Sequence, residues 1–221
     1  MMPALTAMDM GCPLPPDDLA SRDMPVMELD LAATSLWRIH RSTFGPIHYN
    51  RTSTGGTPYR FDAPDDQFGV LYASPSFEAC MAEAVIRDRF QGKSCPLLLD
   101  EDELNRRCIS DLGTTLGRPL RLADLTRPHF HLGMDNRVLS TTAHNYRGPN
   151  LWSVAIHDAY PNIDGIYFTS RFANEASVAI FDRAPLIARG DPIPLVKFHQ
   201  LRGFLAKYDV GIGPPADSWA D

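Results

Sequence analysis

The chain lacks the surplus of basic residues that nucleic-acid-binding proteins generally carry. Its 221 residues include 21 lysines and arginines against 27 aspartates and glutamates, a formal net charge of -6 at pH 7. A protein that neutralises many phosphates needs the opposite balance. We therefore expect no direct nucleic-acid partner, and any anionic ligand must meet a local cluster of arginines.

Long apolar runs and paired cysteines are also missing. No stretch of 18 apolar residues is present, and residues 1–21 contain neither lysine nor arginine, so we expect no membrane span and no secretory signal. The four cysteines, Cys12, Cys80, Cys95 and Cys108, form no CxxC pair and predict neither a zinc site nor a disulfide framework. Reduced thiols of this kind favour a cytoplasmic location.

Familiar nucleotide and hydrolase motifs are absent as well. The chain has no GxxxxGK[S/T] loop, no GxSxG and no GxGxxG. His129 and His131 would point the same way in a strand, but only Asp124 and Asp135 lie near them in the sequence. A metal site needs further ligands, so we expect none here, and we expect the single residues His144 and His157 to be structural.

What is present predicts one globular domain of the α+β class. A hydrophobic content of 44% excludes disorder of the whole chain. We expect an arm over residues 1–30, a domain over 31–210 and a tail over 211–221. Short apolar runs predict strands at Leu36–His40, Val70–Ala73, Pro96–Leu99, Gly165–Thr169 and Ser177–Phe181, the last two joined by a polar turn.

Two helices are expected between these strands. Ser74 can cap the first and Pro75 suits its first turn. Its apolar residues repeat at helical spacing: Phe77, Cys80, Met81, Ala84 and Val85. The second is expected over residues 141–159, with Leu151, Trp152, Ala155 and Ile156 facing the core. Strands and helices do not alternate regularly, which favours α+β over a doubly wound sheet.

Several polar residues interrupt this pattern and are candidates for a site. Arg38 stands in an apolar strand and Arg60 in a loop rich in glycine and proline. Each is either a solvated arginine or a guanidinium that grips a phosphate or carboxylate at two points. Tyr72 is either a half-buried strand tyrosine or an aromatic face that stacks on a planar ring.

Glu83, Ser170 and Arg171 have equally open interpretations. On an α-helical wheel Glu83 lies roughly 130° from the apolar stripe, which predicts a solvated carboxylate unless that second face looks into a cleft. Ser170 and Arg171 follow an expected strand. Such strand ends often carry function, but ordinary turn residues are the alternative.

Taken in order, these positions resemble the RES-domain family, which is named for an arginine, a glutamate and a serine. The matching stretches are Trp37 to Arg41, Gly55 to Phe61, Leu71 to Ser74 followed by Glu83, and Gly165 to Phe181. Together they run from about residue 34 to 185. Many members have GGRW where this chain has Gly55-Gly56-Thr57-Pro58-Tyr59-Arg60, so the arginine is displaced from the glycines.

The resemblance implies a fold like that of ADP-ribosyltransferase toxins, with mixed strands around a cleft for NAD+. It implies the toxin of a bacterial toxin–antitoxin pair, which breaks the nicotinamide–ribose bond of NAD+ and passes ADP-ribose to a protein, to water or to phosphate. The implied partner is an Xre-type or ParS-like antitoxin, besides any protein acceptor. NAD+ is the substrate, and no metal is implied.

The resemblance also implies roles for individual residues. Glu83 would hold the ribose and stabilise the developing cation, Arg38 and Arg60 would fix the diphosphate, and Tyr72 would stack near the nicotinamide ribose or ring. Ser170 would bind the nicotinamide side or orient Glu83, with Arg171 beside it. The alternative function is a non-catalytic nucleotide-binding or interaction module, which could dispense with the glutamate.

Overall fold

The computed structural model describes residues 6–54, 58–87, 97–142 and 145–214. Gly55, Gly56, Thr57, Cys95 and His144, which were considered above, lie outside these ranges. In the described part of the chain, none of the helices has the length and hydropathy that a bilayer-spanning segment requires.

Strands and helices are interleaved along the described chain. The strands are β1 (Val26–Leu29), β2 (Leu36–Arg41), β3 (Val70–Ala73), β4 (Leu98–Asp100), β5 (Arg107–Thr114), β6 (Leu120–Asp124), β7 (Gly165–Thr169), β8 (Ala176–Phe181), β9 (Leu186–Pro194) and β10 (Gly211–Gly213). The helices are α1 (Ala7–Met10), α2 (Phe77–Met81), α4 (Glu101–Asn105), α5 (Arg137–Ser140), α6 (Arg147–Ala159) and α7 (Leu201–Lys207), and a π-helix over Ala82–Ile86 continues α2.

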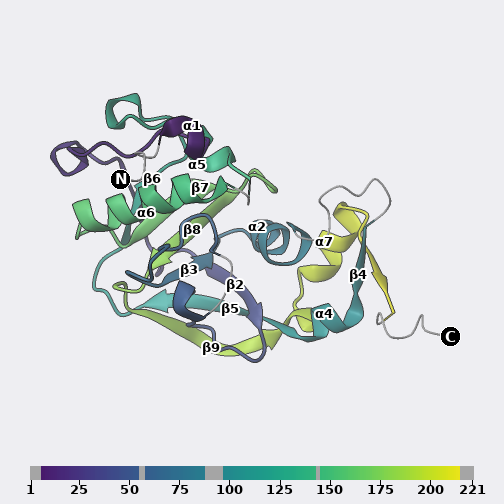
Figure 1. The fold of residues 1–221 in the computed structure, drawn as a ribbon. Helices are drawn as coiled ribbons and strands as arrows, with labels where there is room; N and C mark the ends of the chain where they lie inside the picture. Colours follow the sequence, from purple (N-terminus) through teal and green to yellow (C-terminus); the bar gives the residue numbers. More distant parts are fainter. Residues whose placement is uncertain (1–5, 55–57, 88–96, 143–144, 215–221) are drawn as a thin grey trace.

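The described strands pair into sheets of mixed direction. The largest has the order β1-β6-β7-β8-β3, in which only the β6–β7 pair is parallel. The sheet β2-β5-β9 is antiparallel, and β10 pairs with β4 in parallel. This confirms the expected α+β class, and Figure 1 shows α6 as a layer on the largest sheet, while α4 and α7 lie beside β4 and β10.

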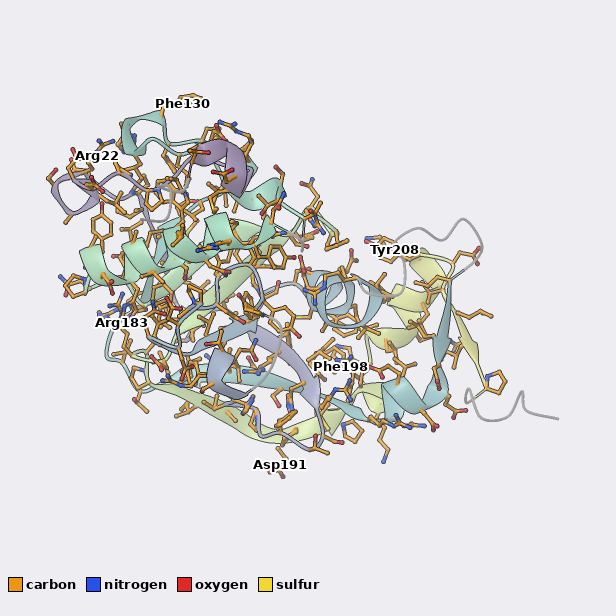
Figure 2. The ribbon with its side chains drawn as sticks, in the orientation of Figure 1. Arg22, Phe130, Arg183, Asp191, Phe198 and Tyr208 are labelled. Atoms are coloured by element: carbon orange, nitrogen blue, oxygen red, sulfur yellow. The ribbon has the colours of Figure 1, made fainter. Side chains whose placement is uncertain are left out.

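Three apolar clusters hold the layers together. One lies where α6 covers the largest sheet and contains Trp152 and Ile156. A second joins that sheet to the β2-β5-β9 sheet through residues such as Leu36 and Leu71. The third packs α2, α4 and α7 on β2 and β5, and Figure 2 shows its Phe198 inside the molecule.

The expected boundaries of the strands and helices agree with the structure at some elements and differ at others. Strands at 36–41, 70–73, 165–169 and 176–181 agree closely with expectation. The expected helix over 141–159 begins only at Arg147. The expected strand over 96–99, whose Pro96 lies outside the described residues, corresponds to β4 at Leu98–Asp100. Ser76, not Ser74, is the N-cap of α2, because the Ser74 hydroxyl is bonded to the Ala176 carbonyl.

Parts of both expected tails pack on the domain. Residues 26–29 form β1, which pairs with β6, and Met10, Cys12 and Leu19 are buried in the cluster beneath α6. At the other end β10 pairs with β4. The sequence pattern did not indicate this packing. The few apolar residues of the first 30 that are buried stand singly among prolines and aspartates and show no helical or strand periodicity.

We predict that Leu19→Ala lowers the free energy of unfolding by about 2–4 kcal/mol, because a fully enclosed leucine leaves a cavity in the core. The measurement is equilibrium unfolding in urea. The matched control is Leu98→Ala, since Leu98 is 60% exposed and its truncation removes little packing. Equal, small effects of both changes would show that residues 1–30 are a detached arm.

Candidate functional site

Arg38 is buried on β2, not solvated. Strand alternation places Trp37 and Ile39 on the face toward α2, and Leu36, Arg38 and His40 on the opposite face. Arg38 is only 9% exposed, and its Nη1 has no hydrogen-bond partner among the described residues. Burial lowers the pKa of Arg38 to about 10, so the guanidinium stays charged at neutral pH.

Arg60 is likewise buried and incompletely bonded. It is 6% exposed, its Nε has no hydrogen-bond partner in the described chain, and its guanidinium lies over the Tyr146 ring with Cζ 5.5 Å from the ring centroid. Burial is the main cause that lowers the pKa of Arg60, opposed by the nearby Tyr146 and Glu83. The alternative of a surface arginine in a turn is therefore wrong.

Tyr72 on β3 fixes the turn that carries Arg60. Its hydroxyl donates to Asp62 Oδ1 at 3.0 Å and accepts from the Phe61 backbone N–H at 2.9 Å. Burial, with Asp62 beside it, holds the pKa of Tyr72 well above its ordinary value, so the phenol is neutral. The hydroxyl is therefore occupied, and the ring is the part of Tyr72 that remains for a ligand.

Glu83 lies in the π-helical turn that follows α2. Ala82 is buried there and Ala84 only half-buried, the reverse of what an α-helical wheel predicts, because a π-helix has more residues per turn. The Glu83 side chain is 25% exposed. The wheel correctly placed Glu83 off the apolar stripe, but it did not show that another part of the chain covers this second face.

That covering segment is the turn after β7, which begins with Ser170. The fully buried Ser170 hydroxyl donates to Glu83 Oε1 at 2.7 Å and accepts from the backbone N–H groups of Phe172 and Ala173 at 3.2 and 3.3 Å. Ser170 is thus fully bonded and fixes one oxygen of the carboxylate. The other oxygen lies 3.8 Å from Nη1 of Arg87.

Arg171 follows Ser170 in this turn and lies near Arg60. Its Nη1 donates to the Thr141 carbonyl at 3.2 Å and its Cζ lies 4.7 Å from the Phe172 ring centroid, while its buried Nε has no hydrogen-bond partner in the described ranges. The positive charge of Arg171 contributes to lowering the pKa of Arg60. Two cations and one carboxylate are therefore held within electrostatic reach of one another.

Cys80 on α2 feels the charges of both Glu83 and Arg38. The buried thiol lies one helical turn before Glu83 and donates to the Trp37 carbonyl at 3.1 Å. Burial raises the pKa of Cys80 to about 12, the Glu83 charge acts in the same direction, and Arg38 acts in the opposite one. The thiol is therefore neutral, and both Glu83 and Arg38 lie within electrostatic reach of it.

Sequence reasoning missed the residues that support the site. Asp62, Tyr146 and Asn150 are all buried, and they contact the Arg60 turn or the guanidinium itself. Asp62 belongs to the same short loop sequence as Arg60, but nothing in that sequence showed that its carboxylate would turn inward. The two histidines considered for a metal site are bonded to the backbone instead. His129 donates a ring N–H to the Asp124 carbonyl, and His131 donates one to the Asp23 carbonyl.

Comparison with known proteins matches this geometry to a family. The model of the RES domain matches residues 35–199, a span that contains Arg38, Arg60, Tyr72, Glu83 and Ser170. The chain belongs to the RES-domain family. No curated protein matches the sequence.

A solved structure shares the fold. One chain of the crystal structure of the M. tuberculosis MbcT–MbcA toxin–antitoxin complex superposes with a TM-score of 0.60 at 17% sequence identity. The alignment covers 85% of this chain and 98% of that one. This RES-domain protein therefore keeps its architecture although most of its residues differ from those of its structural neighbour.

We predict that Arg38→Met raises the melting temperature of the ligand-free protein by a few degrees, because it removes a buried charge whose Nη1 has no hydrogen-bond partner among the described residues. The measurement is thermal unfolding by circular dichroism. Arg38→Lys, which keeps the charge but loses the planar fork, should not be stabilised. A lower melting temperature for Arg38→Met would mean that Arg38 supports the fold rather than a ligand.

Proposed function

We propose that the protein is a toxin that consumes NAD+ by cleaving the bond between nicotinamide and ribose. The observation that carries this proposal is a buried N–H group on each of Arg38, Arg60 and Arg171 that has no acceptor among the described residues, together with a carboxylate, Glu83, that Ser170 fixes. Buried polar groups without partners are rare in folded proteins and call for an explanation. A diphosphate oxygen accepts the bonds that such groups leave unmade.

The arginines supply locally the positive charge that the whole chain lacks. A net charge of -6 does not attract an anionic dinucleotide, but guanidinium groups in a buried environment bind phosphate oxygens strongly. Arg38 and Arg60 are the proposed diphosphate ligands, with Arg171 beside Arg60. The Tyr72 ring is the proposed stacking surface for the nicotinamide ribose or ring.

Glu83 is the proposed catalytic carboxylate. The C1′–N bond breaks with its electron pair going to the pyridinium ring, so nicotinamide leaves neutral and needs no general acid. A single carboxylate then suffices, whereas a glycosidase generally uses two. Held by Ser170, Glu83 binds the ribose 2′-hydroxyl and places negative charge near the oxocarbenium-like carbon without having to reorganise.

The acceptor completes the reaction. A protein side chain, water or phosphate forms the new bond to C1′ and loses a proton where it carries one, which yields ADP-ribosylated protein, ADP-ribose or its phosphate ester. Which acceptor reacts depends on the protein surface around the site and not on the arginines or Glu83. Transferase, glycohydrolase and phosphorylase activities therefore share the same first step and the same residues.

The proposed partner is an antitoxin of the Xre or ParS-like kind, encoded beside the toxin. Membership of the RES-domain family and the fold shared with a chain of the MbcT–MbcA toxin–antitoxin complex support this proposal. A toxin that drains NAD+ must be restrained in the cytoplasm, where its substrate is. We propose that the antitoxin covers the arginine cluster and offers it a carboxylate in place of phosphate.

A non-catalytic nucleotide-binding or interaction module is the second candidate. It would keep the arginines and bind NAD+ without cleaving it. The specific feature against it is the hydrogen bond from Ser170 to Glu83, since a module that only binds phosphate has no need of a fixed carboxylate near its arginines. Release of free nicotinamide separates the two functions.

We predict that Glu83→Gln lowers the rate of nicotinamide release by about a hundredfold or more, because it removes the charge that faces the developing cation. The glutamine oxygen can still accept from Ser170, so the melting temperature should hardly change. Binding of intact NAD+ should largely survive, since its phosphate contacts lie elsewhere. Nicotinamide release, NAD+ binding and growth inhibition on expression are the measurements.

Glu78→Gln is the matched control for this variant. Glu78 lies on α2, but its carboxylate faces outward, where it accepts from Lys207, the last residue of α7, and from Tyr208, which follows it. Its loss should leave cleavage at the native rate. A Glu83→Gln protein that still releases nicotinamide at near the native rate would overturn the mechanism.

A further inference from the structure

One face of α6 holds the turn that presents Arg60. We propose that Tyr146, Asn150 and Ser153 are positioning residues, which fix the Tyr59–Asp62 turn so that the Arg60 guanidinium is ready for an anion. That this anion is the diphosphate of NAD+ rests on the proposed function. The positioning itself rests on the contacts of the turn.

The three residues form a single stripe. Their separations of four and three residues place them on the same side of a helix, one turn apart. All are buried, with Asn150 only 4% exposed. Tyr146 is the N-cap residue of α6, and its carbonyl accepts from the Asn150 backbone N–H at 2.9 Å, so the stripe begins where the helix begins.

The stripe binds the backbone of the turn at successive carbonyls. Asn150 Nδ2 donates to the Tyr59 carbonyl at 2.7 Å and to the Arg60 carbonyl at 3.0 Å. The Ser153 hydroxyl donates to the Phe61 carbonyl at 2.7 Å. Since one amide group bonds the carbonyls on both sides of the Arg60 peptide, neither a shorter nor an apolar side chain reproduces it.

The opposite side of the turn is held as well. The Tyr59 backbone N–H donates to Asp62 Oδ2 at 2.9 Å, and the Phe61 N–H donates to the Tyr72 hydroxyl at 2.9 Å. Donors and acceptors of the turn are therefore paired to β3, to α6 and within the turn. The backbone on either side of Arg60 has little freedom to move.

This restraint matters because the position of Arg60 is unfavourable without a ligand. A buried guanidinium gains solvation if its turn swings outward, and its Nε then finds water. The contacts with α6 oppose that movement. The Tyr146 ring lies against the guanidinium, whose Nε has no hydrogen-bond partner in the described part of the chain. The cost of ordering the arginine is thus met during folding rather than on binding, which favours affinity.

A double-mutant cycle tests this inference. Asn150→Ala is made in the native protein and in an Arg60→Ala protein, and the affinities for ADP-ribose and for inorganic pyrophosphate are measured by calorimetry. We expect Arg60→Ala to weaken binding by about tenfold to a hundredfold, and Asn150→Ala by about tenfold. In the Arg60→Ala protein, Asn150→Ala should weaken binding no further, because a positioning residue acts through the group it positions.

Two further variants guard the interpretation. Tyr160→Phe is the matched control, because the Tyr160 hydroxyl donates to the carbonyls of Leu19 and Arg22 from the other end of α6. It should lower the melting temperature without changing affinity. Ser153→Ala removes one hydrogen bond to the turn and takes the place of Asn150→Ala if that variant fails to fold. It should lower the affinity less than is expected for Asn150→Ala, and again only when Arg60 is present.

The outcomes separate this inference from the proposed function. If Asn150→Ala weakens binding equally with and without Arg60, or leaves affinity unchanged, its role is structural only and the inference is overturned. If the native protein binds pyrophosphate and shows the cycle but does not cleave NAD+, the positioning stands and the proposed function fails. Binding of neither ADP-ribose nor pyrophosphate would overturn both.

Discussion

The burial of arginine side chains that the described chain does not fully bond is the constraint on which the rest of the structure depends. A guanidinium taken out of water destabilises the fold unless its N–H groups find acceptors. Arg38, Arg60 and Arg171 each keep a buried nitrogen without one. Their neighbours hold them in place: the paired strand β2 for Arg38, a doubly bonded turn for Arg60, and a backbone carbonyl for Arg171.

The carboxylate is positioned by equally local means. α2 and its π-helical continuation direct Glu83 toward the turn after β7, where Ser170 donates to it. Ser170 is itself fixed by the backbone of its own turn. The site thus combines charges of both signs on elements from distant parts of the sequence, and each is fixed by contacts formed on folding. The proposed cleavage of NAD+ requires such charges, fixed before the reaction begins.

Sequence patterns predicted the elements whose buried faces are regular. β3, β7, β8 and α6 have continuous or periodic apolar residues. The expected strands agree closely with the structure, and the expected helix ends with α6 at Ala159 but begins six residues too early. β5 and β9 were not predicted, because charges, glycine and proline interrupt their apolar residues. For the site, the family resemblance singled out Arg38, Tyr72, Glu83 and Ser170. Periodicity alone favoured a solvated Glu83, because it carries no information on what packs against a second helix face.

The support of Arg60 could not be predicted, since it depends on α6 meeting a loop about ninety residues away in sequence. The measurement that tests the central claim most directly is a crystal structure with bound ADP-ribose. The account predicts diphosphate oxygens within hydrogen-bond distance of Nη1 of Arg38 and Nε of Arg60. A ligand bound elsewhere, with both nitrogens still without partners, would contradict it.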